Sequence, residues 1–279
     1  MNILVTGGAG FIGTNLIKKL LTKGHKVLSI DNYHTGTKNN HQSEATYIES
    51  DITTFDYSQL PDIDMVFHLA ALARIQVSFD SPVECINVNS FGTLVLVNYA
   101  SDNNIPLVYA GTSSKHGGKF KNPYTFSKDI GEDIVTLFQK HYGLQASIAR
   151  FYNVYGPHQL CDGPYCTVIG TWLKALQEGK PLLITGTGEQ RRDFTHVSDI
   201  IDALYLIYEK NAYGCEFELG RGKSNSLNEL IQIIKPPIHS YISARPGETQ
   251  ITVNTDTTAQ EVLGWRPNID IEDYLKTFS

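Results

Sequence analysis

The sequence predicts an α/β fold, in which a doubly wound parallel sheet is followed by a smaller α/β lobe. Short apolar runs at residues 3–6, 26–30, 65–69, 107–110 and 146–150 have the length and composition of strands that are buried on both faces. Helical periodicity lies between these runs at 11–22, 83–101 and 124–142. Such alternation is typical of a parallel sheet with helices on both faces.

The helix ends are marked by glycines, and the pattern loosens after about residue 151. Gly24, Gly143 and Gly179 stand where predicted helices stop. Further helices are expected at 165–178, 197–210 and 227–234, and prolines at 236, 237 and 246 mark loops. We therefore expect a dinucleotide-binding domain at 1–160, to which later segments return, and a substrate lobe formed mainly by 161–279.

The composition limits the kinds of partner that the protein can bind and the cell compartment in which we expect it. The chain has 279 residues, 41% of them hydrophobic, which is enough for a large core, and its formal charge is −6. No basic block favours nucleic acid, and no apolar run approaches the roughly 18–20 residues of a membrane span. The N-terminus lacks the features of a signal peptide, so we expect a cytoplasmic protein. The four cysteines are expected to be reduced thiols without a metal.

A glycine-rich turn between the first strand and the first helix predicts a dinucleotide site of the Rossmann type. Gly7, Gly10 and Gly13 permit a tight turn, and Gly8 completes a G-x-G-x-x-G match. The helix N-terminus then offers free N–H groups to a pyrophosphate. Asp31, at the end of the second strand, can bind the ribose hydroxyls and would repel a 2′-phosphate. The sequence therefore favours NAD over NADP, and a weaker signal at Asp51 suggests an adenine contact.

A tyrosine and a lysine on one helical face predict an acid–base site. Tyr124 and Lys128 are four residues apart. We expect the Lys128 ammonium, together with an oxidised nicotinamide ring, to lower the pKa of the phenol toward neutrality. A hydroxyl after the strand at 107–110 would hold the reacting oxygen against the tyrosine; Thr112 is the first choice and Ser113 the rival.

At these residues the sequence resembles the extended short-chain dehydrogenase/reductase family, and its nucleotide-sugar 4-epimerases in particular. The resemblance runs nearly from end to end and includes the glycine turn, His68-Leu69-Ala70-Ala71, the segment 150–157 and Leu263-Gly264-Trp265. It implies the catalytic trio Thr112, Tyr124 and Lys128. It also implies NAD contacts from Gly7, Gly10, Phe11, Ile12, Gly13, Asp31, Asn32, Gly36, Asp51, Ile52, Leu69, Ala70, Ala71, Ala73, Asn89, Tyr124, Lys128 and Tyr152.

The same resemblance implies a nucleotide-sugar site. Its expected ligands are Thr112, Ser113, Tyr124, Asn153, Arg192 and Arg245, with the two arginines on the diphosphate. A guanidinium suits phosphate oxygens because it forms bidentate, charge-assisted hydrogen bonds. His68 is expected to pack at a strand end rather than act in catalysis, and His116 is also set aside. The resemblance further implies a homodimer built by the helices at 83–101 and 124–142.

The resemblance implies that Tyr124 takes a proton from a sugar hydroxyl while NAD takes the hydride, which gives a 4-keto sugar. Related dehydratases carry an aspartate–glutamate pair after the threonine, and related decarboxylases a glutamate. Ser113 and Ser114 hold those positions here. We therefore predict a 4-epimerase of a UDP-hexose or UDP-N-acetylhexosamine.

Two other classes remain open, a nucleotide-sugar dehydratase or reductase and a non-catalytic NAD or nucleotide-sugar sensor. The chain also departs from the family pattern. The segment between Gly117 and Tyr124 is short, and Lys115-His116 replaces a more usual valine–tyrosine pair. Thr252 aligns loosely with a position that would leave room for an N-acetyl group. The identity of the sugar therefore cannot be copied from the family.

Overall fold

A seven-stranded sheet forms the centre of the computed structural model, which describes residues 1–278. The strand order is β11-β6-β5-β4-β1-β2-β3, and all neighbouring strands run parallel. The sheet therefore confirms the predicted doubly wound α/β class. Its strands are β1 (Asn2–Thr6), β2 (Lys26–Asp31), β3 (Thr46–Glu49), β4 (Met65–His68), β5 (Leu107–Thr112), β6 (Ala146–Phe151) and β11 (Glu216–Leu219).

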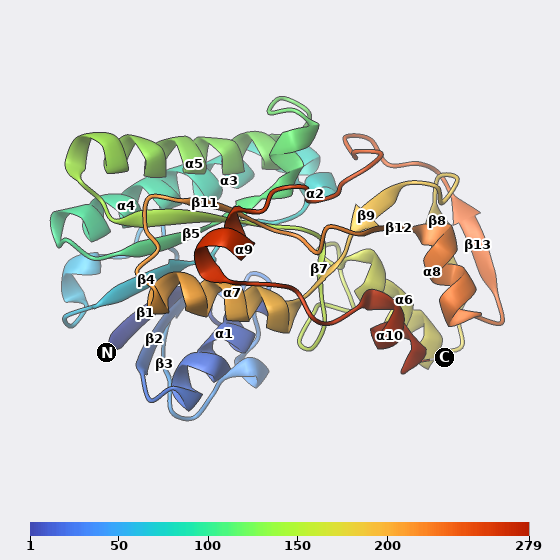
Figure 1. Cartoon of the computed structure of the whole chain (residues 1–279), viewed down its shortest axis with the longest axis horizontal. Helices are drawn as coiled ribbons and strands as arrows, with labels where there is room; N and C mark the ends of the chain where they lie inside the picture. The colour runs from blue at the N-terminus through green and yellow to red at the C-terminus, as the bar shows by residue number, and fades with distance from the viewer. Residues whose placement is uncertain (279) are drawn as a thin grey trace.

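Helices cover both faces of this sheet, as Figure 1 shows. On one face lie α1 (Phe11–Thr22), α7 (Val197–Glu209) and α9 (Thr258–Leu263), and on the other lie α4 (Gly92–Asp102) and α5 (Pro123–Tyr142). Alternate residues of a strand serve the two cores, because successive side chains point to opposite faces. Ile3 and Val5 pack with α1 and α7, whereas Leu4 packs with α4 and α5.

The helix expected at 83–101 is interrupted. The structure has α3 (Pro82–Ile86), then a π-helical turn at Asn87–Phe91, and only then α4. The turn buries Asn89 and Ser90, and the Asn89 amide binds both backbone groups of Leu72. Helical periodicity in a sequence does not reveal such a turn, because its neighbours on both sides are regular.

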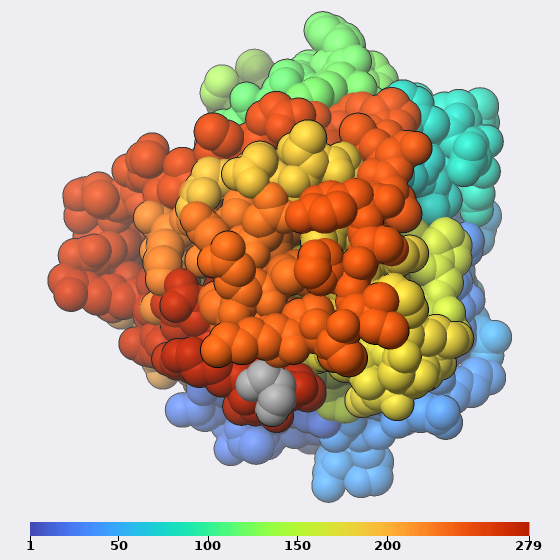
Figure 2. Space-filling view, turned by 90° about the vertical axis from the view of Figure 1, so that its right-hand side faces the viewer, coloured from blue at the N-terminus to red at the C-terminus, as the bar shows by residue number. Residues whose placement is uncertain are grey.

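The second half of the chain forms a smaller lobe at one end of the sheet and also returns to it. The lobe contains α6 (Val168–Gln177), β8 (Leu182–Thr185), α8 (Leu227–Ile234), β13 (His239–Ile242) and α10 (Ile271–Lys276). Two small pairs, β7 (Val154–Tyr155) with β10 (Thr195–His196) and β9 (Arg191–Asp193) with β12 (Ser224–Ser226), connect it to the larger layer. Figure 2 shows the lobe from its own end, with first-half residues visible around the rim.

The returning segments lie within the sheet layers. β11 extends the edge of the sheet beside β6, and α7 packs against α1. A separate core in the lobe contains Trp172, Leu182 and Leu230. The predicted glycine stops are confirmed by left-handed backbone at Gly24, Gly143 and Gly179. Within residues 1–278, no helix combines the length and apolar character needed to cross a bilayer.

Candidate active site

A cavity of about 390 Å³ opens at the carboxyl ends of the central strands. Residues that end or follow β1, β2, β4, β5 and β6 line it, among them Gly10, Asp31, Ala70, Thr112 and Asn153. The site therefore lies where the strand order reverses, between β1 and β4, which is the usual ligand position in this architecture.

The glycine turn forms one wall of the cavity, and different constraints require glycine at its different positions. A Cβ on Gly7 would lie 2.9 Å from the Ala70 backbone, and one on Gly13 would lie 2.2 Å from the Gly7 carbonyl oxygen. Protein packing alone therefore requires glycine at positions 7 and 13. Gly10 has only one neighbour, at 3.3 Å, and no side chain caps the helix that it starts. This open approach to a helix N-terminus fits a pyrophosphate.

The Asp31 carboxylate stands at the far end of the cavity from the strand-β5 residues. It accepts hydrogen bonds from the Ala9 N–H at 2.9 Å and the Tyr33 N–H at 2.8 Å, and burial raises its pKa above the usual value. Gly36 packs behind it, because a Cβ there would lie 3.0 Å from an Asp31 oxygen. The arrangement fixes a carboxylate that can accept the two hydroxyls of a ribose.

The three residues predicted to be catalytic gather at the other end. Thr112 closes β5, Tyr124 lies in the first turn of α5, and the Thr112 hydroxyl is close enough to lower the pKa of the Tyr124 phenol. The Asn122 side chain caps α5 through the Thr125 N–H at 2.7 Å, and the Tyr124 N–H donates to Ser78 Oγ at 3.1 Å. These contacts hold the phenol at the cavity wall. Lys128, one turn along, is buried outside the cavity lining.

Within the protein alone, burial dominates the pKa values of both Tyr124 and Lys128. Burial raises the pKa of Tyr124, and the nearby Thr112 hydroxyl offsets only part of this rise. Burial also lowers the pKa of Lys128 to about 7, because little opposite charge compensates its lost hydration. The protein alone therefore keeps the tyrosine protonated, and the positive charge that favours a phenolate has to come in part from a bound ligand.

A second cavity of about 170 Å³ continues from the first toward the smaller lobe. Arg192, from β9, and Arg245 line it, and Asn153 and Ser113 belong to both cavities. Arg192 is ion-paired with Glu248 at 3.2 Å. Asn153 donates to the Asp193 carbonyl at 3.1 Å, which fixes the turn after β6. The predicted substrate residues thus lie along one continuous groove.

Five of the predicted contact residues do not line either cavity: Gly36, Asp51, Asn89, Lys128 and Tyr152. The Asp51 carboxylate binds Thr53 and Asn32 instead, while its neighbour Ile52 faces the cavity. Asn89 holds the Leu72 backbone from behind. These residues support the walls of the groove.

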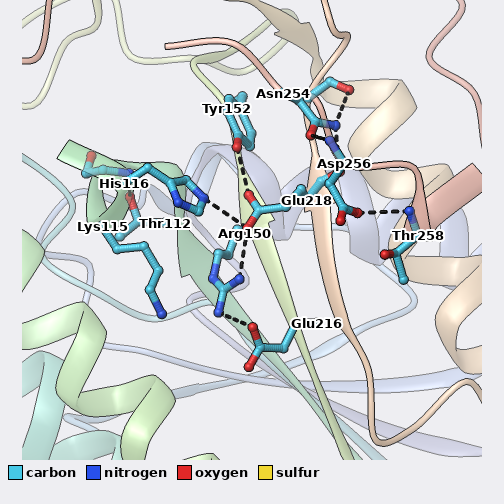
Figure 3. A network of polar contacts seen from close by, with 12 residues as sticks. Thr112, Lys115, His116, Arg150, Tyr152, Glu216, Glu218, Asn254, Asp256 and Thr258 are labelled. Atoms are coloured by element: carbon cyan, nitrogen blue, oxygen red, sulfur yellow. Dashed lines mark hydrogen bonds and ion pairs between the residues drawn. The ribbon is translucent and has the colours of Figure 1, made fainter. Parts of the chain in front are cut away.

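The hydroxyl of Tyr152 points away from the groove into a buried ionic network, shown in Figure 3. It donates to the Glu218 carboxylate at 2.8 Å, and His116 binds the same carboxylate at 3.0 Å. Arg150 on β6 lies directly opposite Glu218 on β11 and bonds it at 2.8 Å. Arg150 also binds Glu132 of α5 at 2.8 Å. The network therefore connects α5 to the edge of the sheet.

His68 behaves as expected of a packed strand-end histidine. It is 1% exposed, with its ring nitrogens 2.7 Å from Thr6 Oγ1 and 3.0 Å from Thr93 Oγ1. Burial lowers its pKa to about 3, so it stays neutral.

Ion pairs and a returning loop cover the short segment after Ser114. Lys115 and Lys119 both bind Asp129 of α5, at 3.1 and 2.8 Å. Lys121 contacts Thr249 at 3.3 Å, and Asn122 contacts the Gly247 carbonyl at 3.3 Å. The loop at 245–249 therefore packs over the short segment between Gly117 and Tyr124.

Sequence reasoning missed several residues of the groove. Arg74, Tyr165, Thr167 and Glu248 all line it. Only Glu248 had a signal, since it follows Arg245-Pro246-Gly247 in the segment already considered for the diphosphate. The others come from loops that reach the groove through tertiary contacts.

Comparison with known proteins agrees with this geometry. Residues 3–220 match the model of the NAD dependent epimerase/dehydratase family. The chain belongs to this family. NAD is accordingly its cofactor, and the open glycine turn and the fixed Asp31 carboxylate fit that molecule. When bound, NAD supplies the reversible hydride acceptor that no side chain can provide.

Individual members of the epimerase/dehydratase family are similar over nearly the whole chain. A protein of Methanocaldococcus jannaschii, provisionally named a UDP-glucose 4-epimerase, is 32% identical over 98% of this chain and 96% of its own length. A Thermotoga maritima UDP-glucose 4-epimerase, solved with UDP-glucose, gives a TM-score of 0.92 at 30% identity, with 99% and 96% covered. A Bacillus cereus UDP-glucuronic acid 4-epimerase, solved with UDP-glucuronic acid and NAD, gives 0.91 at 28% identity, with 99% and 97% covered.

Proposed function

We propose that this protein is an NAD-dependent 4-epimerase of a nucleotide-activated sugar. The substrate is a UDP-hexose or a UDP-N-acetylhexosamine, and the reaction passes through a transient 4-keto sugar. The names of the similar proteins support the UDP-sugar class. The groove supports it independently, because one end suits a dinucleotide and the other presents two arginines to a diphosphate.

The residues of the groove would divide the work as follows. Thr112 holds the 4-hydroxyl of the sugar against Tyr124, and Tyr124 accepts its proton as the hydride leaves C4. Lys128, one turn along α5, would add positive charge that favours the phenolate when its amine is protonated. Arg192 and Arg245 bind the diphosphate, and Asn153 assists them. Hydride return to the opposite face of the turned sugar requires Tyr124 to give the proton back.

The observation that carries this proposal is the identity of the two residues after Thr112. Ser113 and Ser114 line the groove at that place. Elimination of water from a 4-keto sugar needs an acid and a base there, and serine hydroxyls supply neither. Epimerisation needs only the tyrosine and room for the sugar to turn. The alternatives, a dehydratase or reductase and a non-catalytic sensor, remain as outcomes of the test.

We also propose that the protein works in the cytoplasm as a homodimer formed by the surface of α3, α4 and α5. Exposed apolar side chains on this surface support an interface: Val83 is 82% exposed, Phe91 48% and Leu137 49%. The segment 1–160 would hold NAD, and 161–279 mainly the nucleotide sugar. Sedimentation of the purified protein tests the dimer directly, and a monomer at micromolar concentration would contradict it.

The test of the activity is incubation of the purified protein with NAD and a panel of UDP-sugars, followed by separation of the products. Interconversion of C4 epimers without net formation of NADH supports the epimerase. A 4-keto-6-deoxy product would show a dehydratase, and stoichiometric consumption of NADH a reductase. Binding of NAD and UDP-sugar without any product would show a sensor.

A further inference from the structure

Arg74 lines the groove but belongs neither to the proposed catalytic trio nor to the diphosphate clamp formed by Arg192 and Arg245. It follows β4 in an extended conformation and directly precedes α2 (Ile75–Asp80). Its side chain lines both cavities, whereas Arg192 and Arg245 line only the second. Its guanidinium forms no hydrogen bond or ion pair with the other residues of 1–278.

The contacts of α2 explain why Arg74 lies at the border between the cavities. Ser78 of α2 accepts the Tyr124 N–H at 3.1 Å. Gln76 donates to the Pro246 carbonyl at 2.9 Å, next to Arg245. A Cβ on Gly247 would lie 3.0 Å from the Phe79 ring, so this loop packs directly on the helix. Thus α2 bridges the reaction centre and the diphosphate clamp.

The charges around Arg74 leave it without a counter-ion of its own. The charged side chains that act on its guanidinium are Arg245, which repels it, and Glu248, which attracts it. Glu248 is already paired with Arg192 at 3.2 Å. Burial and Arg245 together lower the pKa of Arg74. A half-buried guanidinium in this position is stabilised when a ligand brings an anion.

The sugar of a bound nucleotide sugar has to cross this border. Its C4 must reach Thr112 and Tyr124 in the first cavity, while its C1 is tied to the diphosphate in the second. A carboxylate at C6 is attached to C5, next to the reacting carbon, and therefore lies on the Tyr124 side of the ring. Ser113 and Ser114 line the same border and bring no negative charge.

We propose that Arg74 binds the carboxylate of an acidic sugar, so that the preferred substrate is a nucleotide-activated hexuronic acid. This inference rests on the proposed 4-epimerase activity on a nucleotide-activated sugar, and it assigns an acidic sugar in place of the neutral hexose or N-acetylhexosamine. The guanidinium would form two parallel hydrogen bonds to the carboxylate, which a neutral hexose cannot accept in the same way. Arg74 is thus a specificity-determining residue, separate from the arginines of the diphosphate clamp.

The test compares wild type, Arg74→Gln and Arg74→Lys, with Arg266→Gln as a control because that arginine is exposed and lines neither cavity. Two readouts are needed: kcat/KM for UDP-glucuronic acid and for UDP-glucose, and Kd for both sugars and for UDP alone. We expect wild type to prefer the acidic sugar. Arg74→Gln should lower both the affinity for UDP-glucuronic acid and the kcat/KM with it by about 10- to 100-fold. UDP-glucose and UDP should change less than about 3-fold, and Arg74→Lys should fall between.

Several results would overturn this assignment. An equal loss of affinity for UDP, UDP-glucose and UDP-glucuronic acid would make Arg74 a diphosphate ligand. If Arg74→Gln bound and turned over UDP-glucuronic acid as wild type does, with NAD binding intact, Arg74 would have no part in recognising the carboxylate. If wild type turned over no UDP-sugar, the proposed function would fail, yet the Kd values would still decide whether Arg74 recognises the carboxylate.

Discussion

The Lys128 ammonium lies 4.1 Å from the centre of the Tyr109 ring. The ring is fully buried, and the Tyr109 hydroxyl donates to the Lys128 carbonyl at 3.2 Å, so the aromatic face is held under the ammonium. A cation over a ring face is attracted by the ring quadrupole, but this attraction replaces only part of the lost hydration. The pKa of Lys128 accordingly falls to about 7 from an ordinary value of 10.5.

Lys128→Met should therefore stabilise the cofactor-free protein while it removes activity. A lysine whose pKa is lower in the folded state reduces the free energy of unfolding. This reduction grows as pH falls from about 10.5 to 7 and stays constant at lower pH. We expect the variant to gain on the order of 3 kcal/mol at pH 7 and much less near pH 10. Denaturant midpoints at several pH values measure the difference. A variant that is less stable than wild type at pH 7 would contradict this view of Lys128.

His116 should make stability depend on pH in the opposite sense. Its hydrogen bond to Glu218 raises its pKa, so the pair is fully formed below the unfolded value of about 6.5 and is lost as pH rises through the higher folded value. His116 is half exposed, so the effect should be only about 0.5 kcal/mol. Urea midpoints at pH 5.5 and 8.5 should differ less in His116→Gln than in wild type. His141→Gln, at the exposed end of α5, should behave like wild type.

The parts of the site that local sequence encodes could be predicted, and the parts that tertiary contacts create could not. The glycine turn is local, because Gly7, Gly10 and Gly13 are set by one strand, one turn and one helix. Arg74 reaches the groove only because α2 packs on the loop at 245–249, a contact between segments some 170 residues apart in the sequence. The spacing of Tyr124 and Lys128 was readable, but the direction of their pKa shifts depends on burial, which spacing does not report.

In the fold, too, features set by local sequence could be predicted and features set by tertiary contacts could not. Strand–helix alternation predicted the central sheet, whereas the π-helical turn at Asn87–Phe91 depends on Asn89 finding the Leu72 backbone. Tyr152 belongs to the segment 150–157, from which the resemblance implies an NAD contact. Its hydroxyl instead turns to Glu218, a residue supplied by a strand of the second half. Glu218 had no signal of its own in the sequence.

Asp31→Asn should change the choice of cofactor. Loss of the negative charge removes the repulsion of a 2′-phosphate, and the amide is a poorer acceptor for ribose hydroxyls. We expect affinity for NAD to fall about 10-fold and the preference for NAD over NADP to shrink by more. Titration with both dinucleotides measures this, with Asp62→Asn as an exposed control. An unchanged NAD/NADP ratio would show that Asp31 does not face the ribose.

Arg150→Met should destabilise the protein strongly without touching the groove. It leaves the buried Glu132 and Glu218 carboxylates without their shared guanidinium. Removing one partner of a buried ionic network costs about 3–5 kcal/mol, which corresponds to a fall in Tm of roughly 6–20 °C for a chain of this size. Thermal unfolding without ligand gives the shift. A Tm within about 2 °C of wild type would mean that the network contributes little.

Turnover by Tyr124→Phe tests the central claim most directly. The substitution removes one hydroxyl and keeps the ring, so the cavity wall should remain and NAD should bind as in wild type. We expect conversion of the preferred UDP-sugar to its C4 epimer to fall by about 1,000-fold or more, because the Thr112 and Ser113 hydroxyls that line the same cavity are poor bases near neutral pH. Wild-type rates of epimer formation in this variant, with NAD bound, would show that another residue is the acid–base group.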